Sequence, residues 1–300
     1  MKQPGALRLG VHVSIEGGLL KALERAVALG CSTMQIFSRS PRGGPAPVLS
    51  EEMVQRFDAA RRQADVDPLI VHAPYIMNLA SPEAWTWKRS VVLATEEVAR
   101  CRQIGASYLV MHVGSHRGSG EDAGIARVAE ALKRVLEDAP DGVMILLENT
   151  AGSGQGLGYS FEQLAAMRHG VKRKRAVGVC LDTAHLFAAG FAIHTSEGLE
   201  EMFAQCDRVV GAEHVRAMHL NDSKAAFNSR VDRHWHIGEG HIGLEAMQRI
   251  VTHPRVSCLP LILETPKKSP EDDPRNLSTV RRLGQRAHRA HEEPGPCLSR

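Results

Sequence analysis

Nine side chains of the types that bind metal ions recur along the 300-residue sequence. They are His72, His112, Glu148, Asp182, His185, His219, Asp232, His234 and Glu264. Six of the nine end a short apolar run, such as LIVH up to His72 and LILE up to Glu264. Imidazole and carboxylate groups without a thiolate among them suit zinc, and also manganese or iron. The pattern predicts a site for several metal ions.

The spacing of these six run-ending residues indicates how the chain would bring them together. The intervals between them are 40, 36, 34, 37 and 45 residues. A strand, its returning helix and two loops occupy about 30 residues or more. One ligand per such unit, always at the carboxyl end of its strand, would place all six at one mouth of a closed barrel.

Strands and helices are expected to alternate along the whole chain. Apolar runs rich in Val, Ile and Leu predict strands at Leu7–Val13, Thr33–Phe37, Leu69–His72, Tyr108–Val113, Met144–Glu148, Val177–Asp182, Arg216–Leu220 and Leu261–Glu264. Helical patterns occupy Gly18–Leu29, Glu51–Ala64, Pro82–Ile104, Asp122–Glu137, Phe161–Arg168, Gly198–Val209, Leu244–Val251 and Pro274–Arg289. Eight strand–helix units predict an α/β fold, a single-domain TIM (β/α)₈ barrel over 1–291, with a disordered tail over 292–300. A doubly wound open sheet, the competing architecture, would gather its ligands at one switch point instead of at six strand ends.

Composition and charge narrow the class of protein. The formal net charge is only +3, so any binding of nucleic acid must come from a local surface. Six scattered cysteines without CxxC pairs predict reduced thiols in a cytoplasmic protein. No apolar stretch is long enough for a membrane span, and we expect no membrane partner. The basic run 172–175 precedes a strand, at the end of the barrel away from the ligands, and a solvated loop is its favoured interpretation.

Each candidate ligand has an ordinary structural alternative. A single histidine after an apolar strand is often a hydrogen-bonded residue near the core, and a single aspartate there often caps the next helix. Six such residues at the same end of the barrel are harder to explain without a cation, because crowding charged groups together is unfavourable in free energy unless a cation neutralises them. In the DTAH segment the histidine lies three residues beyond Asp182, so the pair can address two ions. In the DRH segment Asp232 and His234 lie on one side of an extended chain and can share an ion.

Long stretches of the sequence resemble the endonuclease IV family of apurinic/apyrimidinic endonucleases. The matching segments are GVHVSIEGGL (10–19), VHAPYIMNLASP (71–82), MHVGSH (111–116), LLENTAGSGQGLGYSFEQLAAM (146–167), VGVCLDTAHLFAAGF (177–191), MHLNDSKAAFNSRVDRHWHIGEGHIG (218–243) and LILETP (261–266). They span nearly the whole chain. The resemblance implies a TIM barrel with three zinc ions at the carboxyl ends of its strands.

The resemblance also implies how the nine ligands are shared among the three ions. Glu148 would bridge the first two ions, and His72 and His112 would complete the first. The second would be held by Asp182, His219 and Glu264. The third would be bound by His185, Asp232 and His234. None of these nine positions departs from the ligand type of the family.

The activity implied by the resemblance is hydrolysis of DNA at a lesion. The family cleaves the phosphodiester 5′ to an abasic site, leaving a 3′-hydroxyl and a 5′-deoxyribose phosphate, and removes blocking groups from 3′ ends. Neighbouring metal ions suit this reaction, since they activate water and stabilise the attacking and leaving oxygens. Glu148 and then Glu264 are the preferred catalytic carboxylates. The implied partner is double-stranded DNA, and the family expectation is a monomer.

Four residues are predicted to contact DNA. Arg42 and Tyr75 match loop positions that the family pushes into the duplex at the lesion. Arg230 and Arg233 flank Asp232 and are predicted to contact phosphates, with loop solubility as the alternative. The chain departs from many relatives at 43–44, where two glycines follow Arg42 in place of a large side chain.

Two rival classes remain at this point. A sugar isomerase or epimerase of similar barrel type generally needs only one or two metal ions, which leaves the DRH segment and the DTAH histidine without a purpose. A protein that binds DNA lesions without cutting them would tolerate a missing ligand, and none is missing. A purely structural metal site would be closed and usually rich in thiolates.

Overall fold

The structure is a computed structural model that describes residues 7–42, 44–137 and 139–292. Eight parallel strands form its central sheet. Their bounds are β1 Leu9–Val11, β2 Met34–Phe37, β3 Leu69–His72, β4 Tyr108–Met111, β5 Met144–Glu148, β6 Val177–Asp182, β7 Val215–His219 and β10 Leu261–Leu263. Each of them overlaps one predicted strand, so the predicted count and order of the sheet are confirmed.

The sheet closes on itself between its first two strands. The strand order is β1-β10-β7-β6-β5-β4-β3-β2, which leaves β1 and β2 at the two ends. His12 and Gln35 form a parallel bridge between these ends, and the N–H of Val13 donates to the carbonyl of Gln35 at 2.7 Å. Gly10 permits the approach, because a Cβ there would collide with the carbonyl of Thr33. The fold is therefore a single-domain TIM barrel, as the sequence predicted.

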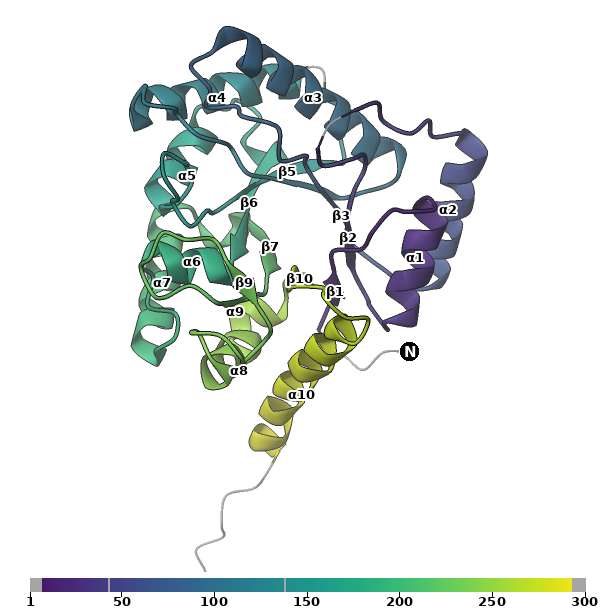
Figure 1. Cartoon of the computed structure of the whole chain (residues 1–300), viewed down its shortest axis with the longest axis vertical. Helices are drawn as coiled ribbons and strands as arrows, with labels where there is room; N and C mark the ends of the chain where they lie inside the picture. The colour runs from purple at the N-terminus through teal and green to yellow at the C-terminus, as the bar shows by residue number, and fades with distance from the viewer. Residues whose placement is uncertain (1–6, 43, 138, 293–300) are drawn as a thin grey trace, which may run out of the picture.

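Helices surround the barrel on its outside (Figure 1). Their bounds are α1 Leu19–Ala28, α2 Glu51–Gln63, α3 Ala84–Gln103, α4 Glu121–Glu137, α5 Phe161–His169, α6 Thr183–Ala189, α7 Ser196–Val209, α8 Leu244–Thr252, α9 Pro254–Ser257 and α10 Asp272–Glu292. The side chains of Ser50, Ser160 and Thr195 accept hydrogen bonds from the first turns of α2, α5 and α7. Each such cap typically stabilises a helix by about 1 kcal/mol.

The inside of the barrel explains why the candidate ligands converge. One buried residue from each of six strands forms an inner apolar layer: Ile70, Val110, Leu146, Cys180, Ala217 and Ile262. Side chains two positions apart in a strand point to the same face. In each of these six strands, the candidate ligand follows the apolar residue by two positions. In the same order, the ligands are His72, His112, Glu148, Asp182, His219 and Glu264. The ligands therefore form the polar layer directly above the apolar one.

Six short elements were not predicted. They are helix α6, helix α9, the 3-10 helices Lys174–Ala176 and Ala212–His214, and the strands β8 Asp222–Ser223 and β9 His234–Trp235, which form a hairpin. Segments of this length contain too few residues to show a hydrophobic period. Helix α10 extends to Glu292, the first residue of the predicted tail, and residues 293–300 lie outside the described part of the chain. In the described residues, no helix combines the length and apolar character that crossing a membrane requires.

Candidate metal centre

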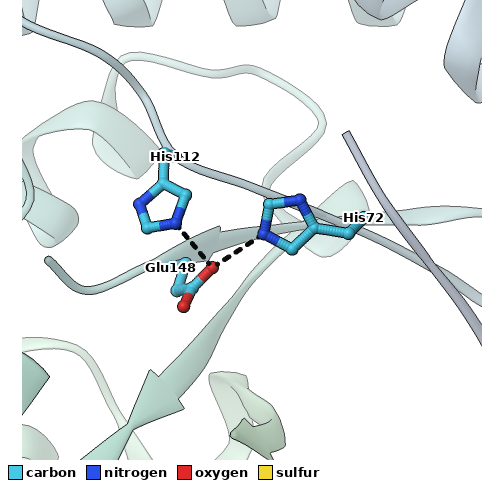
Figure 2. Close-up of side chains that lie close together, drawn as sticks. All are labelled: His72, His112 and Glu148. Carbon is cyan, nitrogen blue, oxygen red and sulfur yellow. Dashed lines mark hydrogen bonds and ion pairs between the residues drawn. The ribbon is translucent and has the colours of Figure 1, made fainter. Parts of the chain in front are cut away.

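The first cluster of candidate ligands lies at the ends of β3, β4 and β5. Nε2 of His72 is 3.2 Å from Oε2 of Glu148, and Nε2 of His112 is 3.4 Å from the same oxygen (Figure 2). His72 and Glu148 are buried, whereas the side chain of His112 is 30% exposed. The cluster is therefore reachable from solvent through His112.

The second cluster shares Glu148 with the first. Ligand atoms of Glu148, Asp182, His219 and Glu264 all lie within 4.8 Å of one another. Nδ1 of His219 is 3.0 Å from Oε1 of Glu148 and 3.2 Å from Oε2 of Glu264. Both oxygens of Glu148 thus face histidines, each on a different side. This is the arrangement that a carboxylate bridging two ions requires.

The third cluster shares Asp182 with the second and extends to the β8–β9 hairpin. Asp182, His185 and His234 present ligand atoms to one another. Asp232 joins them, with Oδ2 at 3.1 Å from Nε2 of His185 and Oδ1 at 3.3 Å from Nε2 of His234. Asp232 is half exposed, so this cluster lies at the edge of the mouth. The structure brings all nine predicted residues together.

Hydrogen bonds fix which nitrogen of each ring faces the clusters. Nδ1 of His72 lies 2.7 Å from the carbonyl of Ala73, and Nδ1 of His185 lies 2.9 Å from the carbonyl of Asn149. A carbonyl only accepts hydrogen bonds, so each Nδ1 donates, and Nε2 is the nitrogen of each ring that is turned to the clusters. Nε2 of His72 faces Glu148, and Nε2 of His185 faces Asp232. Such outer hydrogen bonds orient the histidine ligands of metal sites.

The electrostatics of the mouth favour added positive charge. Burial alone would raise the pKa of Glu148, but the neighbouring His112 and His219 outweigh burial and hold that pKa well below its ordinary range. Burial would lower the pKa of His185, yet Asp182 and other carboxylates raise it well above its ordinary value. Glu148 therefore stays ionised, and the cluster favours a bound proton or cation. No lysine or arginine is paired with any of the four carboxylates in the contacts that the described residues make.

Two further observations are compatible with metal ions bound by these residues. Nε2 of His12 is buried without a hydrogen-bond partner, while Nδ1 of the same ring lies 3.4 Å from Oε1 of Glu264. The sequence left open whether Asp182 caps a helix or is a metal ligand, and the structure is compatible with both roles. Its Oδ1 caps α6 by accepting from the N–H of His185 at 2.8 Å, while its Oδ2 lies 3.5 Å from Nε2 of His234. One oxygen of Asp182 therefore faces the third cluster although the other caps a helix.

Sequence reasoning missed three amides that support the clusters. Gln35 donates from Nε2 to Oε1 of Glu264 at 2.6 Å, and its Oε1 lies 2.8 Å from Nε2 of His219. Asn149 accepts from the N–H of Asp182 at 2.6 Å. Asn221 donates to Oδ2 of Asp182 at 2.7 Å. The signal available in the sequence was a polar residue inside, or directly after, an apolar strand.

The predicted DNA contacts lie at different distances from the clusters. The ring of Tyr75 is 5.4 Å from that of His72, and its side chain is largely exposed. Arg42 is exposed at the tip of the segment after β2, beside position 43, which lies outside the described residues.

Arg230 and Arg233 differ in how firmly they are held. The guanidinium of Arg230 lies 4.5 Å from the ring of Tyr159, and the carbonyl of Arg230 accepts from Ser153. Arg233 is exposed, and its carbonyl accepts from the N–H of Lys224. Both arginines lie in the segment that also carries Asp232. The basic run 172–175 lies at the start of β6, at the opposite end of the barrel from the clusters.

Fold and site together define a class: TIM-barrel proteins whose strand ends carry a metal centre. The family model described as xylose isomerase-like TIM barrel matches residues 23–283. Among curated proteins, "Probable endonuclease 4" of Chloroflexus aurantiacus is 43% identical over 282 residues, which cover 93% of this chain and 99% of the relative. "Probable endonuclease 4" of Geobacter sulfurreducens is 41% identical over 293 residues, 97% of this chain and 99% of the relative. The chain belongs to the endonuclease IV family.

Solved structures agree with this assignment, and they separate the family from the rival class of sugar isomerases and epimerases. Endonuclease IV from Thermus thermophilus is 36% identical, with a TM-score of 0.84 over 93% of this chain and all of that one. A D-tagatose 3-epimerase-like protein has a TM-score of 0.68 at 19% identity, over 94% of this chain and 99% of that one. That second likeness shows the fold alone.

Proposed function

We propose that the protein is a DNA-repair endonuclease that hydrolyses the phosphodiester 5′ to an abasic site. The single observation that supports this most strongly is the chain of three clusters linked by Glu148 and Asp182. An in-line displacement at phosphorus needs positive charge at both the attacking and the leaving oxygen, and adjacent metal ions meet that need. The products would be a 3′-hydroxyl and a 5′-deoxyribose phosphate.

Three zinc ions are the proposed cofactors, one at each cluster, with manganese or iron as alternatives at some of them. When bound, such ions activate water near neutral pH and stabilise the oxygens of the phosphate under attack. His72 and His112 with Glu148 would hold the first ion. Asp182, His219 and Glu264 with Glu148 would hold the second. His185, Asp232 and His234 would hold the third.

The chain's own carboxylates then orient the reacting groups. Glu148 and Glu264 both face His219, and each pKa lies well below its ordinary range, so both are ionised and can accept a hydrogen bond from the attacking water. Glu148 is the preferred catalytic residue because it lies between two clusters, and Glu264 is the second choice. The Gln35 amide holds Glu264 in place.

Recognition of the lesion would use side chains at the rim of the mouth. Tyr75 stands beside His72 with its side chain largely exposed, and Arg42 is exposed in the neighbouring loop. Both would enter the duplex, so that the abasic sugar can turn toward the clusters. Arg230 and Arg233 would contact phosphates. The same open site would accept blocked 3′ ends, whose removal is the second proposed activity. The proposed enzyme is a cytoplasmic monomer.

A sugar isomerase is the second candidate, and the fold likeness to an epimerase-like protein is what favours it. The third cluster argues against it, because a one- or two-metal sugar site would not need Asp232 or His234 facing His185. A protein that binds lesions without cutting is disfavoured by the complete ligand set.

The decisive experiment is cleavage of a labelled duplex that contains one tetrahydrofuran abasic analogue. This analogue cannot undergo β-elimination, so only a hydrolase cuts it. We expect one cut immediately 5′ to the analogue, abolished by exhaustive chelation and restored by zinc. Absence of cutting by fully metallated protein would reject the proposal. A Schiff base trapped by borohydride during turnover on natural abasic DNA would count against hydrolysis.

A further inference from the structure

One face of helix α3 holds the start of the segment that carries Arg42. Segment 38–50 lies between β2 and α2, and its described residues 38–42 and 44–50 run past α3 (Figure 1). Oγ of Ser38 donates to Oε2 of Glu97 at 2.7 Å, and Nε of Arg39 donates to Oε1 of the same carboxylate. Glu97 is fully buried and Arg39 is 5% exposed. Breaking a buried ion pair leaves an uncompensated charge, so this attachment is strongly specified.

The same face of α3 holds the end of the segment as well. Arg100 donates from Nη2 to the carbonyl of Ser38 at 2.8 Å and from Nη1 to the carbonyl of Pro47 at 3.0 Å. Gln103 donates from Nε2 to the carbonyl of Leu49 at 3.1 Å. Residues 97, 100 and 103 are three apart and therefore lie on one side of the helix. In the hydrogen bonds of the described residues, Arg100 connects the two legs of the segment, 38–42 and 44–50.

Helix α3 also supports the loop that carries Tyr75. The N–H of Asn78 donates to Oγ of Ser90 at 2.9 Å, and Nδ2 of Asn78 donates to the carbonyl of Ser115 at 3.0 Å. The ring of Phe37, which precedes Ser38, lies 5.3 Å from the ring of Tyr75. One helix thus fixes the bases of both rim segments relative to each other.

We propose that Glu97, Arg100 and Gln103 form a clamp that positions Arg42 for contact with the abasic duplex. The inference rests on the proposed function and deepens it. The three residues are positioning residues: Glu97 holds the side chains of Ser38 and Arg39, and Arg100 and Gln103 hold backbone carbonyls on either side of Arg42. Arg42 itself is exposed between the two clamped legs. Holding both legs lowers the conformational entropy that the segment would lose on binding DNA.

The test replaces Arg100 by methionine, which keeps the aliphatic stem and removes the bridge. The matched control is Arg102→Met, the same change two residues further along α3 at an exposed position. For Arg100→Met we expect KM for the abasic duplex to rise roughly tenfold with little change in kcat. Hydrolysis of bis(4-nitrophenyl) phosphate, which needs no duplex recognition, and bound metal should both stay at the wild-type level. Arg102→Met should match wild type in every assay.

A double-mutant cycle shows whether the clamp acts through Arg42. If it does, Arg100→Met added to Arg42→Ala should cause little further loss of incision, because the shared effect is already gone. Faster amide hydrogen exchange over residues 40–48 in Arg100→Met would report the released segment directly. If Arg100→Met folds poorly, Gln103→Ala can be tested in its place, because this change is at an exposed side chain. We expect Gln103→Ala to have a smaller effect of the same kind.

Two results would overturn the clamp. One is equal incision kinetics for Arg100→Met, Gln103→Ala and Arg102→Met. The other is full additivity of Arg100→Met with Arg42→Ala. Both results can be interpreted only if the wild-type protein cuts the tetrahydrofuran duplex. If the wild type does not cut it, the proposed function fails first, and hydrogen exchange over 40–48 still reports whether α3 holds the segment.

Discussion

Nδ1 of His219 lies 3.0 Å from Oε1 of Glu148, although 71 residues separate the two in sequence. The other oxygen of Glu148 faces His72 and His112. A single carboxylate therefore has histidines on both sides, each from a different strand. Because its two oxygens face two clusters, loss of Glu148 should affect two of the proposed metal ions at once.

Replacing Glu148 by glutamine should lower bound metal by more than one ion per chain. The amide keeps the shape of the side chain but removes the charge that draws cations into the buried layer. We expect incision of abasic duplex to fall roughly 100-fold or more, since even outer contacts of metal sites cost about 10–100-fold. Metal analysis and single-turnover incision measure the two effects. Glu130→Gln, at an exposed ion pair on α4, is the control. Unchanged metal content in Glu148→Gln would contradict the bridging role.

Replacing His234 by alanine should remove one ion and leave the other two. His234 contributes to the third cluster alone, through Asp182, Asp232 and His185. Metal content should fall by one ion per chain, and incision should be lost while the first two clusters stay loaded. His241→Ala, an exposed histidine in the same segment, is the control. Full incision by a His234→Ala protein that holds two ions would favour a two-metal mechanism.

Much of this site could be predicted from the sequence because the strands impose it. Each ligand that ends a strand lies two residues beyond an inward-facing core residue, and that period of two is visible in the runs. Gln35 could not be found in this way. Its Oε1 meets Nε2 of His219 across 184 residues, and only closure of the barrel between β1 and β2 brings the two together. Local patterns contain no information about such a contact.

The clamp on segment 38–50 was missed for a related reason. Glu97 and Arg100 lie in a long helix in which other charged residues recur, so nothing in the sequence singles them out. The partners of Arg100 include the backbone carbonyls of Ser38 and Pro47, which any residue would offer. The short helix α6 was hidden because it starts directly after β6 without an intervening loop. Its cap, Asp182, is part of the strand before it.

Replacing Gln35 by leucine should weaken the hold of the second cluster on its ion. The change leaves the volume similar but removes the donor to Glu264 and the acceptor next to Nε2 of His219. We expect metal to be lost to a chelator about tenfold faster, because such outer partners orient the ligands. Gln55→Leu, at an exposed position on α2, should behave as wild type. Equal rates of metal loss in the two variants would show that Gln35 only packs the barrel.

Removing the metal should lower thermal stability as well as activity. Four carboxylates meet at the mouth, and the proposed ions would offset their repulsion in the folded chain. Chelation should reduce Tm by about 5 °C or more, since binding that is specific for the folded state adds to its stability. Scanning calorimetry before and after chelation measures the shift. Zinc added back should restore the Tm. Chelation should lower the Tm of His234→Ala more than that of Glu148→Gln, because His234→Ala is expected to hold more metal at the start. A Tm that does not change on chelation would mean that the ions contribute nothing to the fold.

The thiols should play no part in the reaction, and their ionisation explains why. Burial raises the pKa of Cys31 to about 11 and that of Cys206 to about 12, so both thiols remain protonated at pH 8. The thiolate is the reactive form and is gained only as the pH approaches those values. Iodoacetamide at pH 8 should therefore modify the exposed Cys258 and spare Cys31 and Cys206, as peptide mass spectrometry would show. Incision should continue unchanged in the alkylated protein, with Cys258→Ser as the control. Loss of incision in step with alkylation of the wild type would require a role for a thiol that metal-assisted hydrolysis does not need.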